Sequence, residues 1–178
     1  VAFYLGQAYE AGGRWDEAYE SYRTFLRVPD AAVPGFPDAR RDLARRLAFY
    51  DSNRQWTHRD LDELVREIKN ALWSQDSARL LRHRAGVNFF AMSWQQEESD
   101  ENSDIPTFDI GAFLRRSRVR FEDELELTSN ANEAYLRTWG WSHRIPTWYL
   151  YFRRVDFPAD PEIHGTWEWA GILFGESY

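Results

Sequence analysis

The chain has 178 residues, 43% hydrophobic and 29% charged, which is the composition of a globular protein with one large domain or two small ones. Its formal net charge of −7 argues against nucleic acid as a partner, and the absence of cysteine excludes disulfides, thiolate metal sites and a cysteine nucleophile. No apolar run approaches the roughly 18 residues of a membrane-spanning helix, so we predict no membrane-spanning segment in this chain.

The N-terminal segment carries two stretches with helical periodicity. Ala8 and Tyr9 lie on one face of the first stretch, and Tyr19 and Tyr22 lie on one face of the second. The dipeptide Gly12-Gly13 between them favours a helix end, because glycine adopts a left-handed conformation without penalty. This pattern predicts an αα-hairpin. We also expect the natural chain to continue upstream, since the sequence begins inside the first predicted helix.

Several residues of this hairpin carry a family resemblance: Leu5, Gly6, Tyr9, Gly13, Ala18 and Tyr22, with Trp15 where tyrosine is usual. The hairpin resembles a tetratricopeptide repeat (TPR), a helix–turn–helix unit of about 34 residues. The departures are Ala2 in place of tryptophan, Phe25 in place of a small residue, and a shifted closing proline at Pro29. The resemblance implies a binding groove for a protein or peptide on the first helix, at Phe3, Gln7 and Glu10. The alternative is an unrelated αα-hairpin with the same packing needs.

A third helix is predicted from Asp38 to Tyr50, with Leu43, Leu47 and Tyr50 on one apolar stripe and arginines on the opposite face. A single repeat cannot bury its hydrophobic face alone, so something must pack on the hairpin. The third helix is either the first helix of a degenerate second repeat or a capping helix. Its arginines are interpreted as a solvated face, with an acidic partner as the alternative. We assign residues 1–53 to this TPR-like helical region.

Residues 54–178 are predicted to form an α+β domain. Thr57 followed by Asp60 resembles a capping box and predicts the start of a strongly amphipathic helix, with Asp60 in its first turns. A short helix is predicted after Asp76, and another short helix after Asp109. Strands are predicted at 87–94, 119–127, 133–141, 147–156 and 165–174, with turn chemistry at 158–161 and an acidic surface loop at 97–104. The short connections between the last four strands predict an antiparallel β-meander with the helices packed on it.

The order of elements between Asn70 and Phe89, which is the end of a long helix, a short helix and a strand, is similar to the opening of NTF2-like domains. In that family these elements begin a cone around a pocket, so the resemblance implies a small-ligand or enzymatic pocket. A different helix-on-sheet fold is the alternative.

Asp123 breaks the alternation of its predicted strand by falling on the inward face. In a pocket, burial would raise the pKa of this carboxyl and make Asp123 a candidate general base. The alternatives are a bulge, a register shift, or an ion pair with Arg137 or Arg153. The four histidines have no metal-binding spacing, so no metal and no cofactor are predicted.

The last three predicted strands are rich in tryptophan, with Trp139 and Trp141 expected to share one face, as are Trp167 and Trp169. Rings on both sides of a sheet suggest that one face meets the helices. The other face is expected to be covered by the N-terminal helices, with a bound peptide or glycan as the alternatives. The candidate ligand-binding residues are Asp123, Trp139, Trp141, Trp148, Trp167 and Trp169.

The leading interpretation is a noncatalytic scaffold that binds a protein or peptide through Phe3, Gln7 and Glu10. The competing one is a small-ligand or enzymatic pocket built from Asp123 and the tryptophans. An enclosed cavity lined by Asp123 and at least two tryptophans would favour the pocket, whereas an open helical groove would favour the scaffold.

Overall fold

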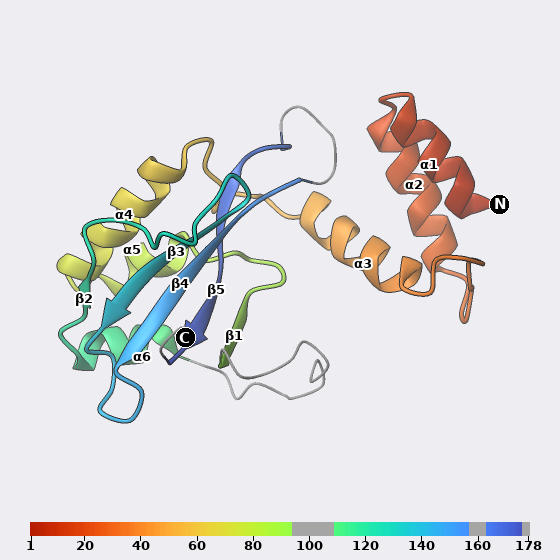
Figure 1. Ribbon diagram of the computed structural model, residues 1–178. Coiled ribbons are helices and arrows are strands. Elements are labelled where there is room, and N and C mark those ends of the chain that lie inside the picture. The colour runs from red at the N-terminus through yellow and green to blue at the C-terminus, as the bar shows by residue number, and fades with distance from the viewer. Residues whose placement is uncertain (94–108, 157–162, 176–178) are drawn as a thin grey trace. The chain divides into compact units, whose positions relative to one another are not determined.

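The computed structural model describes residues 1–93, 109–156 and 163–175, and Figure 1 shows their course. The acidic segment at 97–104 and the predicted turn at 158–161 lie outside the described residues. The chain divides into two compact units, one built from 1–54 and 155–165 and the other from 55–154 and 166–178. In the part of the chain that is described, no helix is long and apolar enough to cross a membrane.

The first unit, here called the helical unit, contains α1 (Ala2–Ala11), α2 (Trp15–Leu26) and α3 (Ala39–Tyr50). The turn between α1 and α2 is closed by a hydrogen bond of 2.9 Å from Arg14 N to Tyr9 O. Gly13 adopts a left-handed φ of 70° in this turn. The predicted αα-hairpin, with its glycine stop, and the predicted third helix are therefore confirmed.

Aromatic side chains attach α3 to the hairpin. The ring of Tyr50 stacks on Tyr19 with centroids 3.9 Å apart, and its hydroxyl donates to Asp16 Oδ1 at 2.6 Å. Arg40, on the face expected to be solvated, instead donates to the Leu26 carbonyl oxygen at 2.8 Å and so stabilises the end of α2. The buried residues of this core are Phe3, Ala18, Tyr19, Tyr22, Phe25, Val33, Ala39, Leu43 and Leu47.

The second unit, here called the α+β unit, contains α4 (Leu61–Trp73), α5 (Ser77–Arg82) and α6 (Ile110–Arg116). Each helix begins after an aspartate whose carboxylate accepts a hydrogen bond from a backbone N–H in the first turn. The caps are Asp60, Asp76 and Asp109, at 2.9, 2.9 and 2.8 Å. These contacts satisfy backbone donors that a helix start leaves unpaired. They confirm the predicted starts after Asp76 and Asp109, whereas the cap of α4 is Asp60 and not Thr57.

The described strands form one sheet in the order β1-β5-β4-β3-β2. They are β1 (Phe90–Ser93), β2 (Arg120–Phe121), β3 (Glu133–Trp139), β4 (Thr147–Arg154) and β5 (Trp167–Phe174). The antiparallel pairing from β2 to β5 confirms the predicted meander and the α+β class. However, β1 pairs parallel to β5, so the sheet as a whole is mixed.

The core of the α+β unit lies between its helices and one face of the sheet. Leu136, Leu150 and Ile172 lie opposite one another on β3, β4 and β5, and all three are fully buried. They belong to the same cluster as Leu64 and Ile68, which lie on the apolar stripe of α4. The predicted stripe therefore marks the face of α4 that packs on the sheet.

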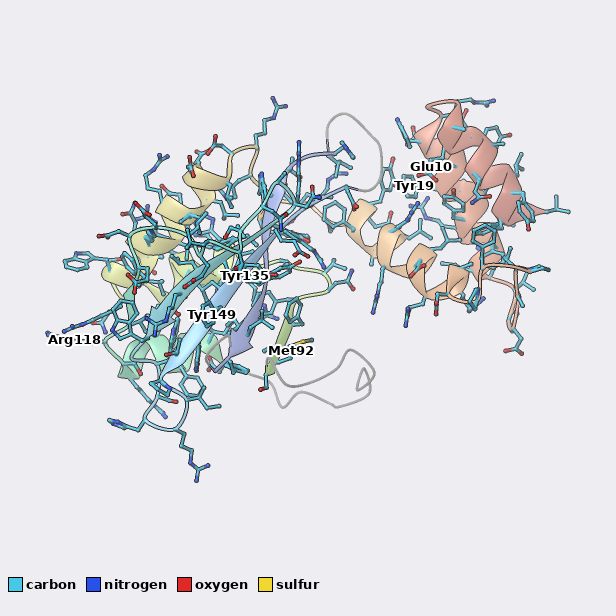
Figure 2. All side chains as sticks on the ribbon, in the orientation of Figure 1. Glu10, Tyr19, Met92, Arg118, Tyr135 and Tyr149 are labelled. Atoms are coloured by element: carbon cyan, nitrogen blue, oxygen red, sulfur yellow. The ribbon has the colours of Figure 1, made fainter. Side chains whose placement is uncertain are left out.

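Tyrosines occupy the opposite face of the sheet, where Tyr135 and Tyr149 are labelled in Figure 2. Tyr135 lies opposite Tyr151, with ring centroids 5.3 Å apart, and the Tyr151 hydroxyl donates to Glu133 at 2.9 Å. Burial, reinforced by the bond to Glu133, raises the pKa of Tyr151. Trp148 on β4 faces the helices, whereas Tyr149 and Tyr151 lie on the other face of the same strand.

The strand predicted at 119–127 is wrong in extent, because only Arg120–Phe121 pair regularly with β3. Further along, Glu122 N donates to Arg137 O at 3.0 Å and Glu126 N donates to Tyr135 O at 2.9 Å. Between these two hydrogen bonds, the segment from Glu122 to Glu126 contains more residues than the facing segment of β3 from Arg137 to Tyr135, as in a β-bulge. Asp123 lies within this irregularity and is exposed, so the expectation that it faces inward is also wrong.

Trp139 and Trp141 do not continue one strand face, because β3 ends at Trp139. Gly140 has a φ of 84°, and a Cβ there would lie 2.6 Å from Arg118 O. The turn at this glycine directs Trp141 into the core, where its ring stacks on Trp148 at 4.5 Å. The alternation of residues between the two faces of a strand does not reveal this change of chain direction.

Candidate functional site

A groove of about 290 Å³ in the helical unit lies between α1, α3 and the segment that precedes α3. We call it the helical groove. Its lining includes all three residues that the sequence selected on the first helix, Phe3, Gln7 and Glu10. The remaining lining residues are Tyr22, Gly35, Phe36, Pro37, Asp38, Ala39, Asp42, Leu43 and Arg46.

Phe3 forms part of the floor of the helical groove, since only 6% of its surface is exposed. Its ring contacts Tyr22 and Phe36, with centroids 6.5 and 5.4 Å away. Phe36 is 46% exposed, so an aromatic surface remains open to solvent beside Gln7, which is also exposed. The helical groove therefore combines an apolar floor with an accessible amide beside it.

Glu10 is held in a fixed position at the edge of the helical groove. Its carboxylate accepts a hydrogen bond of 2.6 Å from the Tyr22 hydroxyl and lies 3.3 Å from Arg46 Nη1. Burial raises the pKa of Tyr22, and the bond to Glu10 adds to this shift, so the phenol remains a donor. These contacts join α1, α2 and α3 and fix the groove in advance of any ligand.

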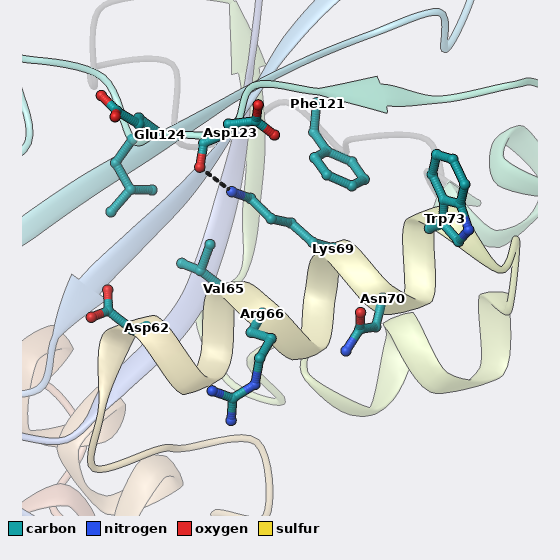
Figure 3. Close-up of a pocket in the computed structure, with 10 residues that line it drawn as sticks. Asp62, Val65, Arg66, Lys69, Asn70, Trp73, Phe121, Asp123 and Glu124 are labelled. Carbon is teal, nitrogen blue, oxygen red and sulfur yellow. Dashed lines mark hydrogen bonds between the residues drawn. The ribbon is translucent and has the colours of Figure 1, made fainter.

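A larger groove of about 700 Å³ in the α+β unit lies between α4 and the chain at and after β2 (Figure 3). We call it the α4–β2 groove. One wall is a stripe along α4, and the other comes from residues 121 and 123–125. The lining residues are Asp62, Val65, Arg66, Lys69, Asn70, Trp73, Phe121, Asp123, Glu124 and Leu125.

Lys69 reaches across the α4–β2 groove, and its Nζ donates to the Asp123 carbonyl oxygen at 2.7 Å (Figure 3). The same ammonium lies 5.6 Å from the centroid of the Phe121 ring. Burial lowers the pKa of Lys69, and the Asp123 carboxylate opposes this shift. The groove thus contains a partly desolvated cation between two walls.

The structure brings Asp123 together with a tryptophan that the sequence did not select. Trp73 lines the same groove and is 83% exposed. The helical spacing could have identified it. Trp73 follows Leu72 at the end of the amphipathic helix and lies outside the apolar stripe, so its ring is expected to be exposed.

The tryptophans selected with Asp123 do not line either groove. Trp141, Trp148 and Trp169 are buried in the core, where each indole N–H is bonded: to Thr138 Oγ1 at 2.7 Å, Ile145 O at 2.9 Å and Gly171 O at 2.9 Å, respectively. Trp167 packs partly buried against the same core, and Trp139 is half-buried beside Arg137.

Sequence analysis also missed a pair of histidines in the α+β unit. His58 Nε2 and His83 Nδ1 lie 3.1 Å apart, although the two residues are distant in the sequence. Burial lowers the pKa of both imidazoles, and the neighbouring His58 lowers that of His83 further. Among the described residues, no group of three or more histidine, aspartate or glutamate side chains is arranged to hold a metal ion.

A scan against protein-family models, a search of curated proteins and a search of solved structures each found no match. The geometry and chemistry of the two grooves are therefore the evidence on function.

Proposed function

We propose that this chain is a noncatalytic binding module whose helical unit holds a protein or peptide segment in the helical groove. The observation that carries this proposal is the convergence of Phe3, Gln7 and Glu10 on one groove that α3 completes. The TPR-like pattern of the hairpin selected these residues independently of the groove geometry.

The chemistry of the helical groove suits a peptide ligand. Phe3 and Phe36 offer an aromatic surface for an apolar side chain, and the exposed Gln7 amide can both donate to and accept from a peptide backbone. Because Glu10 is engaged by Tyr22 and Arg46, its carboxylate is better suited to fixing the groove than to proton transfer. A groove formed in advance reduces the ordering entropy lost on binding.

The test is quantitative affinity capture with the full chain and a variant that blocks the groove, Gln7→Arg combined with Asp42→Arg. Both side chains are exposed, so the fold should be retained. Phe3 is left unchanged because it is part of the core. The matched control is Thr24→Arg with Glu20→Arg, which changes the charge equally at exposed positions of α2.

We expect the groove variant to lose the partners of the wild type by roughly tenfold or more, as for residues central to an interface. The control should retain them. Recovery of the same partners by wild type and groove variant would contradict the assignment.

A small-ligand site in the α+β unit is the second candidate, and the observation that favours it is the position of Asp123 in the α4–β2 groove. It has less support, because Asp123 is exposed and, among the described residues, Trp73 is the one tryptophan that lines this groove. A ligand-observed NMR screen would test it by comparing the wild type with Asp123→Asn. Small-molecule hits that this substitution abolishes would favour the second candidate.

A further inference from the structure

The α4–β2 groove contains an exposed sheet edge beside a helix. β2 is the last strand in the order of the described strands, so within the described part of the chain only its side toward β3 is paired. Glu122 N donates to Arg137 O, which means that the neighbouring residue Phe121, opposite Thr138 on β3, directs its backbone N–H and C=O groups away from β3. That outward side faces the groove, since Lys69 of α4 reaches the Asp123 carbonyl from there.

Lys69 occupies a position that protects such an edge. Lys69 belongs to α4 and not to the edge strand, but its ammonium covers one outward acceptor and, like a covering helix, hinders the pairing of another chain. However, an ammonium has three donors, and Lys69 uses one of them in its bond to Asp123 O. The other two can donate to a ligand carboxylate. If the ammonium moves toward that carboxylate, Asp123 O becomes available to accept a hydrogen bond from a ligand N–H.

The chemical character of the groove changes along its length (Figure 3). Trp73 and Phe121 form an aromatic end, and Asp62 and Glu124 form an acidic end. Two cations of α4, Arg66 and Lys69, lie between them, and within the described residues neither forms an ion pair with an acidic side chain. Asp123 lines the same stretch, and its carboxylate offsets one of these two positive charges, which leaves the stretch with a net positive charge. The complementary ligand therefore has an apolar group, then an acidic group, then a basic group.

An extended peptide supplies such groups at a suitable spacing, because residues i, i+2 and i+4 of a strand share one face. It also supplies backbone hydrogen-bond partners for the unpaired N–H and C=O groups of an open sheet edge. Addition of a strand to an edge beside a helix is an established mode of peptide recognition, in which main-chain bonds give affinity and side-chain pockets give specificity.

We propose that the α4–β2 groove binds an extended peptide as an added strand on β2, with an apolar, an acidic and a basic side chain at alternate positions. The apolar side chain packs on Trp73 and Phe121, the acidic one meets Arg66 and Lys69, and the basic one meets Asp62 and Glu124. This site is on a different unit from the helical groove and does not depend on it.

The probe is acetyl-Thr-Leu-Thr-Glu-Thr-Lys-Thr-amide, together with the same peptide in which Leu and Lys exchange places, because the strand direction is not fixed. Binding to the full chain is measured by calorimetry and by shifts of backbone amide NMR signals. We expect one of the two orders to bind and to shift the amide signals of Phe121 and Asp123. Failure of both to bind, or shifts confined to other regions, would overturn the proposal.

Two further comparisons separate strand addition from nonspecific contact. N-methylation of the better peptide at alternate residues, which removes its main-chain donors toward β2, should weaken binding by at least roughly tenfold. Trp73→Ala and Arg66→Glu should do the same. The controls are Leu127→Ala, which removes an exposed apolar side chain that does not line the groove, and Arg116→Glu, which reverses an exposed charge outside the groove. Equal binding of the methylated peptide, or equal effects of groove and control substitutions, would show that the peptide does not add to β2.

Discussion

Gly6 marks the closest approach between α1 and Tyr22 of α2. A Cβ at this position would lie 2.3 Å from Tyr22 Cε1 and 2.5 Å from Cδ1. The ring cannot move away freely, because it is buried and its hydroxyl is bonded to Glu10. A tyrosine at this position of the hairpin thus requires a glycine opposite it.

Gly6→Ala should therefore lower the free energy of unfolding, by about 1–3 kcal/mol, which is the usual effect of overpacking. Alanine is the better helix former by about 1 kcal/mol, so helix propensity alone predicts the opposite sign. Urea denaturation followed by circular dichroism distinguishes the two. Gln7→Ala, at an exposed neighbouring position, serves as the control and should change stability by less than about 0.5 kcal/mol. A stabilised Gly6→Ala variant would contradict the packing explanation.

His58 and His83 should make the α+β unit less stable in acid. Burial lowers the pKa of both imidazoles from the ordinary value of 6.5, so folding favours their neutral forms. The stabilisation is fully present above that ordinary value and is lost as the pH falls below it toward the folded-state pKa values. Glu63 and Glu67 face the pair and favour protonation, whereas Arg79 and Arg82 oppose it at His83.

The measurement is urea denaturation of the wild type and of His58→Gln with His83→Gln, at about pH 7.5 and about pH 5.5. We expect the free energy of unfolding to fall more between these values in the wild type than in the double variant. Imidazole NMR titrations provide the independent check. Equal pH dependence of both proteins would show that the pair does not contribute.

At the scale of the elements, α4 has two functions, because one stripe packs in the core and another lines the α4–β2 groove. Its start is fixed by Asp60, whose carboxylate accepts from Glu63 N at 2.9 Å. Asp60→Ala should lower the free energy of unfolding by about 1 kcal/mol, since the first turn loses its cap. Asp60→Ser should retain most of the stability, because serine also caps. Thermal and urea denaturation would reveal the difference, and equal stability of the two variants would argue against capping.

The elements with strong local patterns could be predicted from the sequence. α4 was predictable because Leu64 and Ile68 repeat at helical spacing, and β4 because Trp148 and Tyr149 alternate between faces. β1 gave no indication of its parallel partner β5, because pairing across a long connection depends on tertiary packing. The register shift around Asp123 was also invisible locally, and that shift determines whether this carboxylate lies in the core or at a groove.

The two candidate grooves differed in how far the sequence could predict them, for the same reason. Phe3, Gln7 and Glu10 follow helical spacing on a single element, so sequence could place them together. The α4–β2 groove joins Lys69 to Asp123, and the histidine pair joins His58 to His83; both depend on chain segments that meet only after folding.

At the scale of the whole molecule, the two units have separate hydrophobic clusters that share no residue. Leu136 is fully buried in the cluster of the α+β unit, and Leu47 is 6% exposed in that of the helical unit. Leu136→Ala and Leu47→Ala should each destabilise their own unit by about 2–5 kcal/mol, because each leaves a cavity. We expect each substitution to leave the stability of the other unit largely unchanged.

Hydrogen exchange resolved by mass spectrometry is the suitable measurement, since it reports stability segment by segment. Leu136→Ala should accelerate amide exchange in β3, β4 and α4 while α1 and α2 keep their wild-type protection. Leu47→Ala should have the reverse effect. A calorimetric scan should then show two transitions, of which each substitution shifts one. Loss of protection in both units after either substitution would mean that the chain unfolds as one cooperative body, and the separation of the two clusters would then have no energetic meaning.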